Sequence, residues 1–89
     1  MDVFQWNETK NQRLKKLRGI SFEEIVESKF VAVKQHPTRE GQQIILFEYQ
    51  NYIWVAPCVM NDKGIFLKTL YRSRKHTEIY RRRKHETAE

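Results

Sequence analysis

The stretch Ile65-Phe66-Leu67-Lys68-Thr69-Leu70-Tyr71 is followed directly by Arg72-Ser73-Arg74-Lys75-His76 and then by Tyr80-Arg81-Arg82-Arg83-Lys84. The first segment has the β-branched and aromatic content of a strand, and Ser73 is a good N-cap for a helix behind it. From Ile65 to Glu89 there are eight Lys or Arg and three Asp or Glu, a formal charge of +5 within a chain total of +6. The sequence therefore predicts a strand that runs into a cationic helix, with a polyanion, RNA first, as the partner.

Three more segments upstream have the composition of strands, namely Phe30–His36, Gln43–Tyr49 and Tyr52–Met60. The residues between them are typical of turns and loops. We expect three or four antiparallel strands in a meander. Pro57 lacks a backbone donor, so the strand that holds it lies at an edge or is bulged there.

The N-terminal part carries two helix-start signals. Asn7 is a good N-cap for a helix that runs to Arg18, and Gly19 ends that helix. Ser21 is followed three residues later by Glu24, the capping-box pattern, so a second and shorter helix is expected to about Ser28.

Length and composition limit the kind of function. A chain of 89 residues that is 39% hydrophobic suits a single domain, residues 1–89, with one modest core. An open cleft is therefore expected rather than a deep pocket for a cofactor, and no cofactor is predicted. Cys58 is the only cysteine, so no intramolecular disulfide can form. No segment reaches the ~18 apolar residues of a membrane span, and we expect a cytoplasmic protein with no membrane partner.

Both ends of the chain resemble the BrnT-type toxins. Trp6-Asn7 with Lys10, followed by Arg18-Gly19-Ile20-Ser21-Phe22-Glu23-Glu24, is similar to the opening of that family. Phe66–Lys75 with Tyr80 looks like its closing strand and helix. There are departures: the family often has Asn, Lys and His where this chain has Leu14, Leu17 and Arg18, and the chain has one extra residue between the strand cation and the helix arginine.

The resemblance implies a fold and a function. The fold is α+β and RelE-like, with two N-terminal helices packed on a 3–5 stranded antiparallel sheet and a C-terminal basic helix. The function is that of the toxin in a type II toxin–antitoxin system, a metal-independent endoribonuclease that cleaves mRNA, free or on the ribosome. The implied partners are mRNA and a small antitoxin, of the ribbon-helix-helix class in the BrnT case, with DNA bound only through the antitoxin complex.

Metal-free RNA cleavage needs a base, an acid and cations that stabilise the charge on the phosphorane. We expect Lys68, Arg72 and Arg74 to converge in one concave anion site, and His76 to join them in catalysis. The side chains expected to bind RNA are His36, Tyr71, Ser73, Lys75 and Arg81. No set of residues has the spacing of a metal site, and none is predicted.

Each of these residues also has a structural interpretation. Lys68 can be a solvated strand residue, and Arg81–Lys84 a solvated or antitoxin-facing helix end, because four consecutive helical residues point in four directions. His85 lies in the C-terminal tail. A non-catalytic RNA- or ribosome-binding module would use the same basic patch, and so would a docking surface for an acidic protein.

Overall fold

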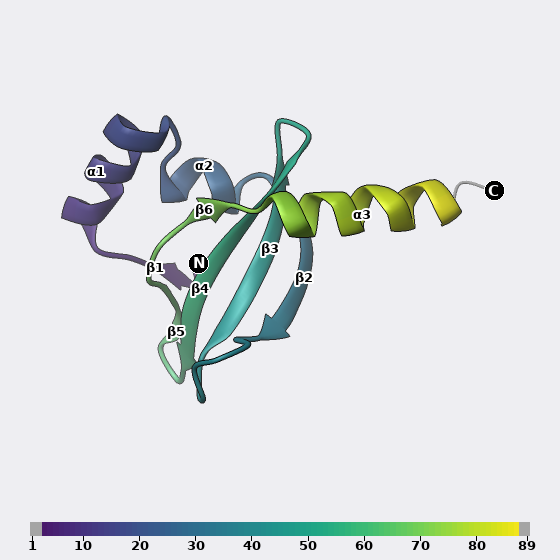
Figure 1. The fold of residues 1–89 in the computed structure, drawn as a ribbon. Helices are drawn as coiled ribbons and strands as arrows, with labels where there is room; N and C mark the ends of the chain where they lie inside the picture. The colour runs from purple at the N-terminus through teal and green to yellow at the C-terminus, as the bar shows by residue number, and fades with distance from the viewer. Residues whose placement is uncertain (1–2, 88–89) are drawn as a thin grey trace.

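The computed structural model describes residues 3–87, with side chains to residue 83. It has a mixed α/β fold in which a six-stranded sheet lies between helices (Figure 1). The elements along the chain are β1 (Phe4–Gln5), α1 (Glu8–Arg18), α2 (Phe22–Val26), β2 (Lys29–Gln35), β3 (Gln43–Tyr49), β4 (Tyr52–Asn61), β5 (Gly64–Leu67), β6 (Tyr71–Arg72) and α3 (Arg74–Thr87).

The sheet has the strand order β1-β5-β4-β3-β2. The short strand β6 pairs with Trp54 and Val55, near the start of β4. The β2, β3, β4 and β5 pairings are antiparallel, whereas β1 runs parallel to β5. The predicted fold class was therefore wrong. The sheet is mixed and six-stranded, it dominates the molecule, and the three helices around it are short. The error has a physical cause, since strands of two residues such as β1 and β6 are too short to show a period in the sequence.

β1 reaches β5 through a close backbone approach at Gly64. The amide of Ile65 donates to the carbonyl of Val3 at 2.7 Å. A Cβ at Gly64, whose φ is +132°, would lie 2.3 Å from that carbonyl oxygen. Only glycine fits here, because it lacks the Cβ and adopts positive φ without strain.

Pro57 explains why one predicted strand became two. Its carbonyl accepts a hydrogen bond from the amide of Lys68 at 2.8 Å, on the edge of β4 that faces β5 and β6. The nitrogen of a strand residue points to the same edge as its carbonyl, so the missing N–H of Pro57 leaves a gap in the ladder at this point. β5 ends at Leu67, opposite Cys58, and β6 begins at Tyr71, opposite Val55. The strand that holds Pro57 lies inside the sheet and not at an edge, and the interruption falls in its partner, between β5 and β6.

Two apolar clusters lie on opposite faces of the sheet. On one face, α1 and α2 contribute Leu14, Phe22 and Ile25 to a cluster with strand residues that include Phe47 and Trp54. Cys58 is buried in the same cluster, and burial raises the pKa of its thiol. On the other face, Tyr80 of α3 packs against the remaining cluster, Ile44, Leu46, Ile53 and Val55. The C-terminal part of α3 continues beyond the β2 edge of the sheet (Figure 1).

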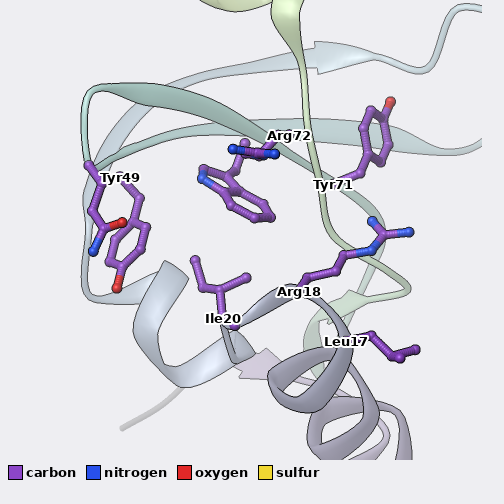
Figure 2. Close-up of a pocket in the computed structure, with 9 residues that line it drawn as sticks. Leu17, Arg18, Ile20, Tyr49, Tyr71 and Arg72 are labelled. Carbon is purple, nitrogen blue, oxygen red and sulfur yellow. The ribbon is translucent and has the colours of Figure 1, made fainter.

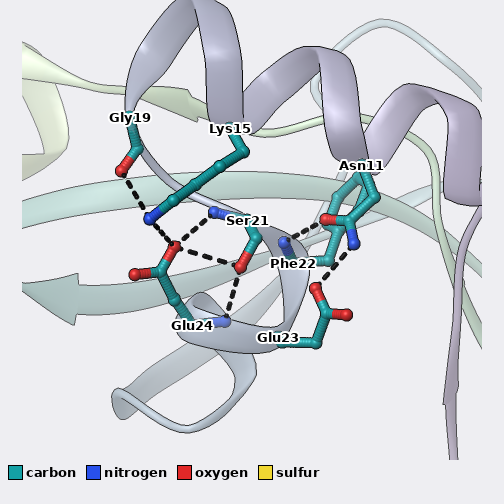
Figure 3. Close-up of polar contacts among 7 residues, drawn as sticks. All are labelled: Asn11, Lys15, Gly19, Ser21, Phe22, Glu23 and Glu24. Atoms are coloured by element: carbon teal, nitrogen blue, oxygen red, sulfur yellow. Dashed lines mark hydrogen bonds and ion pairs between the residues drawn. The ribbon is translucent and has the colours of Figure 1, made fainter.

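A polar network fixes the corner between α1 and α2 (Figure 3). The predicted capping box is present, with Ser21 and Glu24 bonded reciprocally, and Lys15 pairs with Glu24 at 2.8 Å. Buried Asn11 accepts from the amide of Phe22 at 2.7 Å and donates to Glu23 at 2.6 Å. The hydrogen bond from Asn11 is the main reason that the pKa of Glu23 is lowered from 4.5.

α3 is tied to the sheet by buried Thr77. Its hydroxyl accepts from the amide of Ile53 at 2.9 Å and donates to the carbonyl of Ser73 at 2.6 Å. None of the helices within residues 3–87 is both long and apolar enough to cross a membrane.

Candidate functional site

A cavity of about 550 Å³ opens between the end of α1, the β3–β4 turn and β6 (Figure 2). We call it the arginine–aromatic cavity. It is lined by Leu17, Arg18, Gly19, Ile20, Tyr49, Gln50, Trp54, Tyr71 and Arg72.

Arg72 is placed in this cavity by strand pairing. It lies opposite Trp54 in the β4–β6 ladder, so both side chains emerge on the same face. Its guanidinium group lies 6.0 Å from the centroid of the Trp54 ring and 5.3 Å from that of Tyr52. These distances are within the range of cation–π contacts, which favour a position of the guanidinium beside these aromatic rings.

Arg18 lines the same cavity from the C-terminal end of α1. Gly19, with φ at +75°, ends α1 in a left-handed conformation and leaves Arg18 on the last turn. One guanidinium nitrogen, Nη1, donates to the carbonyl of Leu70 at 2.6 Å. This bond uses one of the five N–H donors of the group. It fixes the guanidinium next to the segment that leads into β6.

The tyrosines differ in their orientation. In the view of Figure 2, Arg72 lies between Tyr49 on one side and Arg18 with Tyr71 on the other. Tyr71 pairs with Val55, whose side chain belongs to the cluster under α3, so Tyr71 emerges on the opposite side of β6 from Arg72. It therefore stands at the rim and is 40% exposed. Tyr49, from the end of β3, is the better placed of the two to stack a base beside Arg72.

The charged side chains among the described lining residues of this cavity are all positive. Two guanidinium groups line it, and no Asp or Glu is among its described lining residues. Planar guanidinium groups match the oxygen pairs of a phosphate, and aromatic rings stack on nucleobases. The arrangement therefore suits a nucleotide of a single strand, with the phosphate on the arginines and the base against tyrosine.

A second basic cavity, about 480 Å³, lies at the other end of α1. We call it the lysine–histidine cavity. It is lined by Lys10, His36, Thr38, Arg39, Gln42, Pro57, Lys68 and Thr69. Nδ1 of His36 accepts from the amides of Thr38 and Arg39 at 3.1 and 3.0 Å, which orients the ring within its loop.

The expected convergence of Lys68, Arg72 and Arg74 was wrong. Lys68 lines the lysine–histidine cavity, whereas Arg72 lines the arginine–aromatic cavity. Arg74 is exposed on the first turn of α3 and lines neither of them. The cause is the break at Pro57, which takes Lys68 out of the ladder before Arg72 rejoins it.

His76, Ser73 and Lys75 also lie outside both cavities. Ser73 caps α3, accepting from the amide of His76 at 3.1 Å, and its hydroxyl is 2.7 Å from Nδ1 of His76. Burial lowers the pKa of His76 from 6.5, and the charges of Lys34 and Lys75 lower it further. The ring is therefore neutral at pH 7 and engaged in the helix cap. Lys75 is exposed beside it.

Arg81 has a structural contact, donating to the carbonyl of Asn51 at 2.7 Å, so it holds α3 to the β3–β4 turn. Arg82, the next residue of α3, is exposed. The side chains of Lys84 and His85 lie outside the described residues. Within the described part of the chain, no three His, Cys, Asp or Glu side chains are grouped as a metal site requires.

Comparisons of the chain with models of known protein families, with curated proteins and with solved structures found no match.

Sequence reasoning missed Arg18 and Trp54, and among the tyrosines that could stack a base it preferred Tyr71 to Tyr49. Trp54 stands in a periodic apolar run, which is typical of core residues. The role of Arg18 has no local signal, because its partner, the carbonyl of Leu70, is distant in the chain.

Proposed function

We propose that this protein binds single-stranded RNA in the arginine–aromatic cavity and cleaves it, as the toxin of a type II toxin–antitoxin pair. One observation carries the binding part: Arg18 and Arg72 line the same cavity with Tyr49, and no described carboxylate opposes them. The toxin assignment rests on the likeness of the two chain ends to BrnT-type toxins. We place the protein in the cytoplasm, where mRNA and a small antitoxin are available to it.

The proposed reaction is transesterification. The 2′-hydroxyl attacks the adjacent phosphorus and the 5′-oxygen leaves, giving a 2′,3′-cyclic phosphate and a 5′-hydroxyl. The two guanidinium groups stabilise the charge that builds up on the phosphorane oxygens. Of the two tyrosines that line the cavity, only Tyr49 is on the same side as Arg72, so its hydroxyl is the group available for proton transfer. Lys68 and His76 have no part in this step, since neither lines the cavity.

A second function, an RNA- or ribosome-binding module without catalysis, is favoured by one feature. The described lining residues of the arginine–aromatic cavity include no His, Lys, Asp or Glu, the usual groups for proton transfer. Binding in this cavity is common to both functions, and cleavage separates them.

The deciding experiment incubates the purified protein with single-stranded RNA in EDTA and maps the product ends. The toxin proposal predicts 5′-hydroxyl and cyclic phosphate ends with the wild type and loss of cleavage in Arg72→Gln. Retention of cleavage in Arg82→Gln controls for the loss of one exposed charge. Binding without any cleavage would establish the module instead. A neighbouring reading frame for a ribbon-helix-helix protein would support the antitoxin partner.

A further inference from the structure

We propose that the lysine–histidine cavity binds a second phosphate of the same RNA strand, so that one single strand crosses both cavities along the segment from Lys68 to Arg72. This inference rests on the proposed function. It assigns a role to a cavity that the cleavage site does not use.

The cations of this cavity come from three separate parts of the fold. Lys10 is on the first turn of α1, Arg39 is in the β2–β3 loop, and Lys68 follows β5. No Asp or Glu is among the described lining residues, and the hydroxyls and amide of Thr38, Thr69 and Gln42 line the space between the cations. Cations that converge from distant segments without a carboxylate repel one another, and a bound anion relieves that repulsion.

His36 adds a ring N–H donor to this cavity. Its Nδ1 accepts two backbone N–H bonds, so in the neutral ring the proton is on Nε2. The geometry therefore leaves Nε2 as the ring nitrogen that can donate to a phosphate oxygen.

Two elements connect the two cavities over a short distance. α1 has Lys10 at one cavity and Arg18 at the other, about 12 Å apart along the helix at ~1.5 Å per residue. The second element is the segment from Lys68 to Arg72 itself.

A single strand fits this path better than a duplex. A strand that places a base against Tyr49 must turn that base away from any partner, as unpaired nucleotides do. Its next phosphates can then follow the Lys68–Arg72 segment from one set of cations to the other. The strand would be held by charge at both cavities and by stacking at one.

The test compares a dinucleotide with a decanucleotide, both of single-stranded 2′-O-methyl RNA, which lacks the attacking hydroxyl and is not cleaved. Binding is measured against salt concentration for the wild type, Lys68→Gln, Arg72→Gln and, as a control, Arg82→Gln. Each lost phosphate contact lowers the slope of log affinity against log salt by about 0.7. His36→Asn is added because a shorter side-chain acceptor keeps the loop turn but removes the Nε2 donor.

We expect Arg72→Gln to lower affinity for both oligonucleotides. Lys68→Gln and His36→Asn should weaken the decanucleotide alone, with the slope reduced by about 0.7 for Lys68→Gln. If Lys68→Gln behaves like Arg82→Gln on the decanucleotide while Arg72→Gln still weakens both, the second site is refuted and the proposed function stands. If the wild type binds neither oligonucleotide, both fail together.

Discussion

The guanidinium group of Arg72 lies 6.0 Å from the centroid of the Trp54 ring, directly across the β4–β6 ladder. This pairing makes a two-residue strand into a fixed part of the cavity wall. It also places the guanidinium of Arg72 beside two aromatic rings, those of Trp54 and Tyr52, in a residue that lines the cavity.

Arg72→Lys should be intermediate between the wild type and Arg72→Gln in RNA affinity. Lysine keeps the charge but loses the planar fork and the stacking surface, and an exposed cation–π contact contributes about 0.5–1 kcal/mol. Titration of labelled single-stranded RNA gives the order. Equal RNA affinity of the lysine variant and the wild type would show that only the positive charge at this position contributes to binding.

Gly64→Ala should destabilise the fold by about 1–3 kcal/mol, because the new Cβ meets the Val3 carbonyl and φ is positive. Urea unfolding measures the loss, and hydrogen exchange at Ile65, whose amide bonds to Val3, locates it. Gly41→Ala is the control, since its φ is +80° but open space surrounds it. Faster exchange at Ile65 in Gly41→Ala than in Gly64→Ala would contradict the explanation.

Thr77→Val should lower the free energy of unfolding by about 1–3 kcal/mol, because it leaves the buried amide of Ile53 without an acceptor. The side chain keeps its shape, so packing is unchanged. We expect the Ile53 amide to exchange faster and α3 to loosen from the sheet. Thr77→Ser, which retains the hydroxyl, should restore most of the exchange protection. Protection that stays intact in the valine variant would show that the hydroxyl does not anchor the helix.

Acid should weaken the α1–α2 corner through Glu23. Its pKa is lower in the folded state than the ordinary 4.5, mainly because Asn11 donates to the carboxylate. A lowered folded pKa stabilises the fold above the ordinary value, and this stability is lost as pH falls through the folded pKa. Glu23→Gln should therefore reduce the decline of the urea midpoint below pH 4.5. Identical acid declines in the wild type and Glu23→Gln would rule this out.

The sequence predicted the local elements better than the site. The start of α1 at Asn7 and the capping box of α2 were recognisable because a side chain bonds a backbone amide three residues away. The two-residue turn at Gln50 and Asn51, both at positive φ, separates β3 and β4 as expected. Contacts between residues so close in the chain can be predicted without knowledge of the fold.

The rest depends on contacts between distant parts of the chain. Arg18 meets the Leu70 carbonyl and shares a cavity with Arg72 only because β6 returns to the end of β4 nearest to α1. Lys68 and Arg72 are close in sequence, yet the Pro57 gap separates their cavities. No periodicity in the sequence reports either relationship.

The most direct test of RNA binding in the arginine–aromatic cavity is photocrosslinking. Single-stranded RNA that contains thiouridine is bound to the protein, irradiated, digested and mapped by mass spectrometry. We predict crosslinks on Tyr49 and Trp54 or their immediate neighbours, which are lost in Arg72→Gln and kept in Arg82→Gln. Crosslinks confined to the α3 residues Arg81 to Arg83, unaffected by Arg72→Gln, would contradict the account.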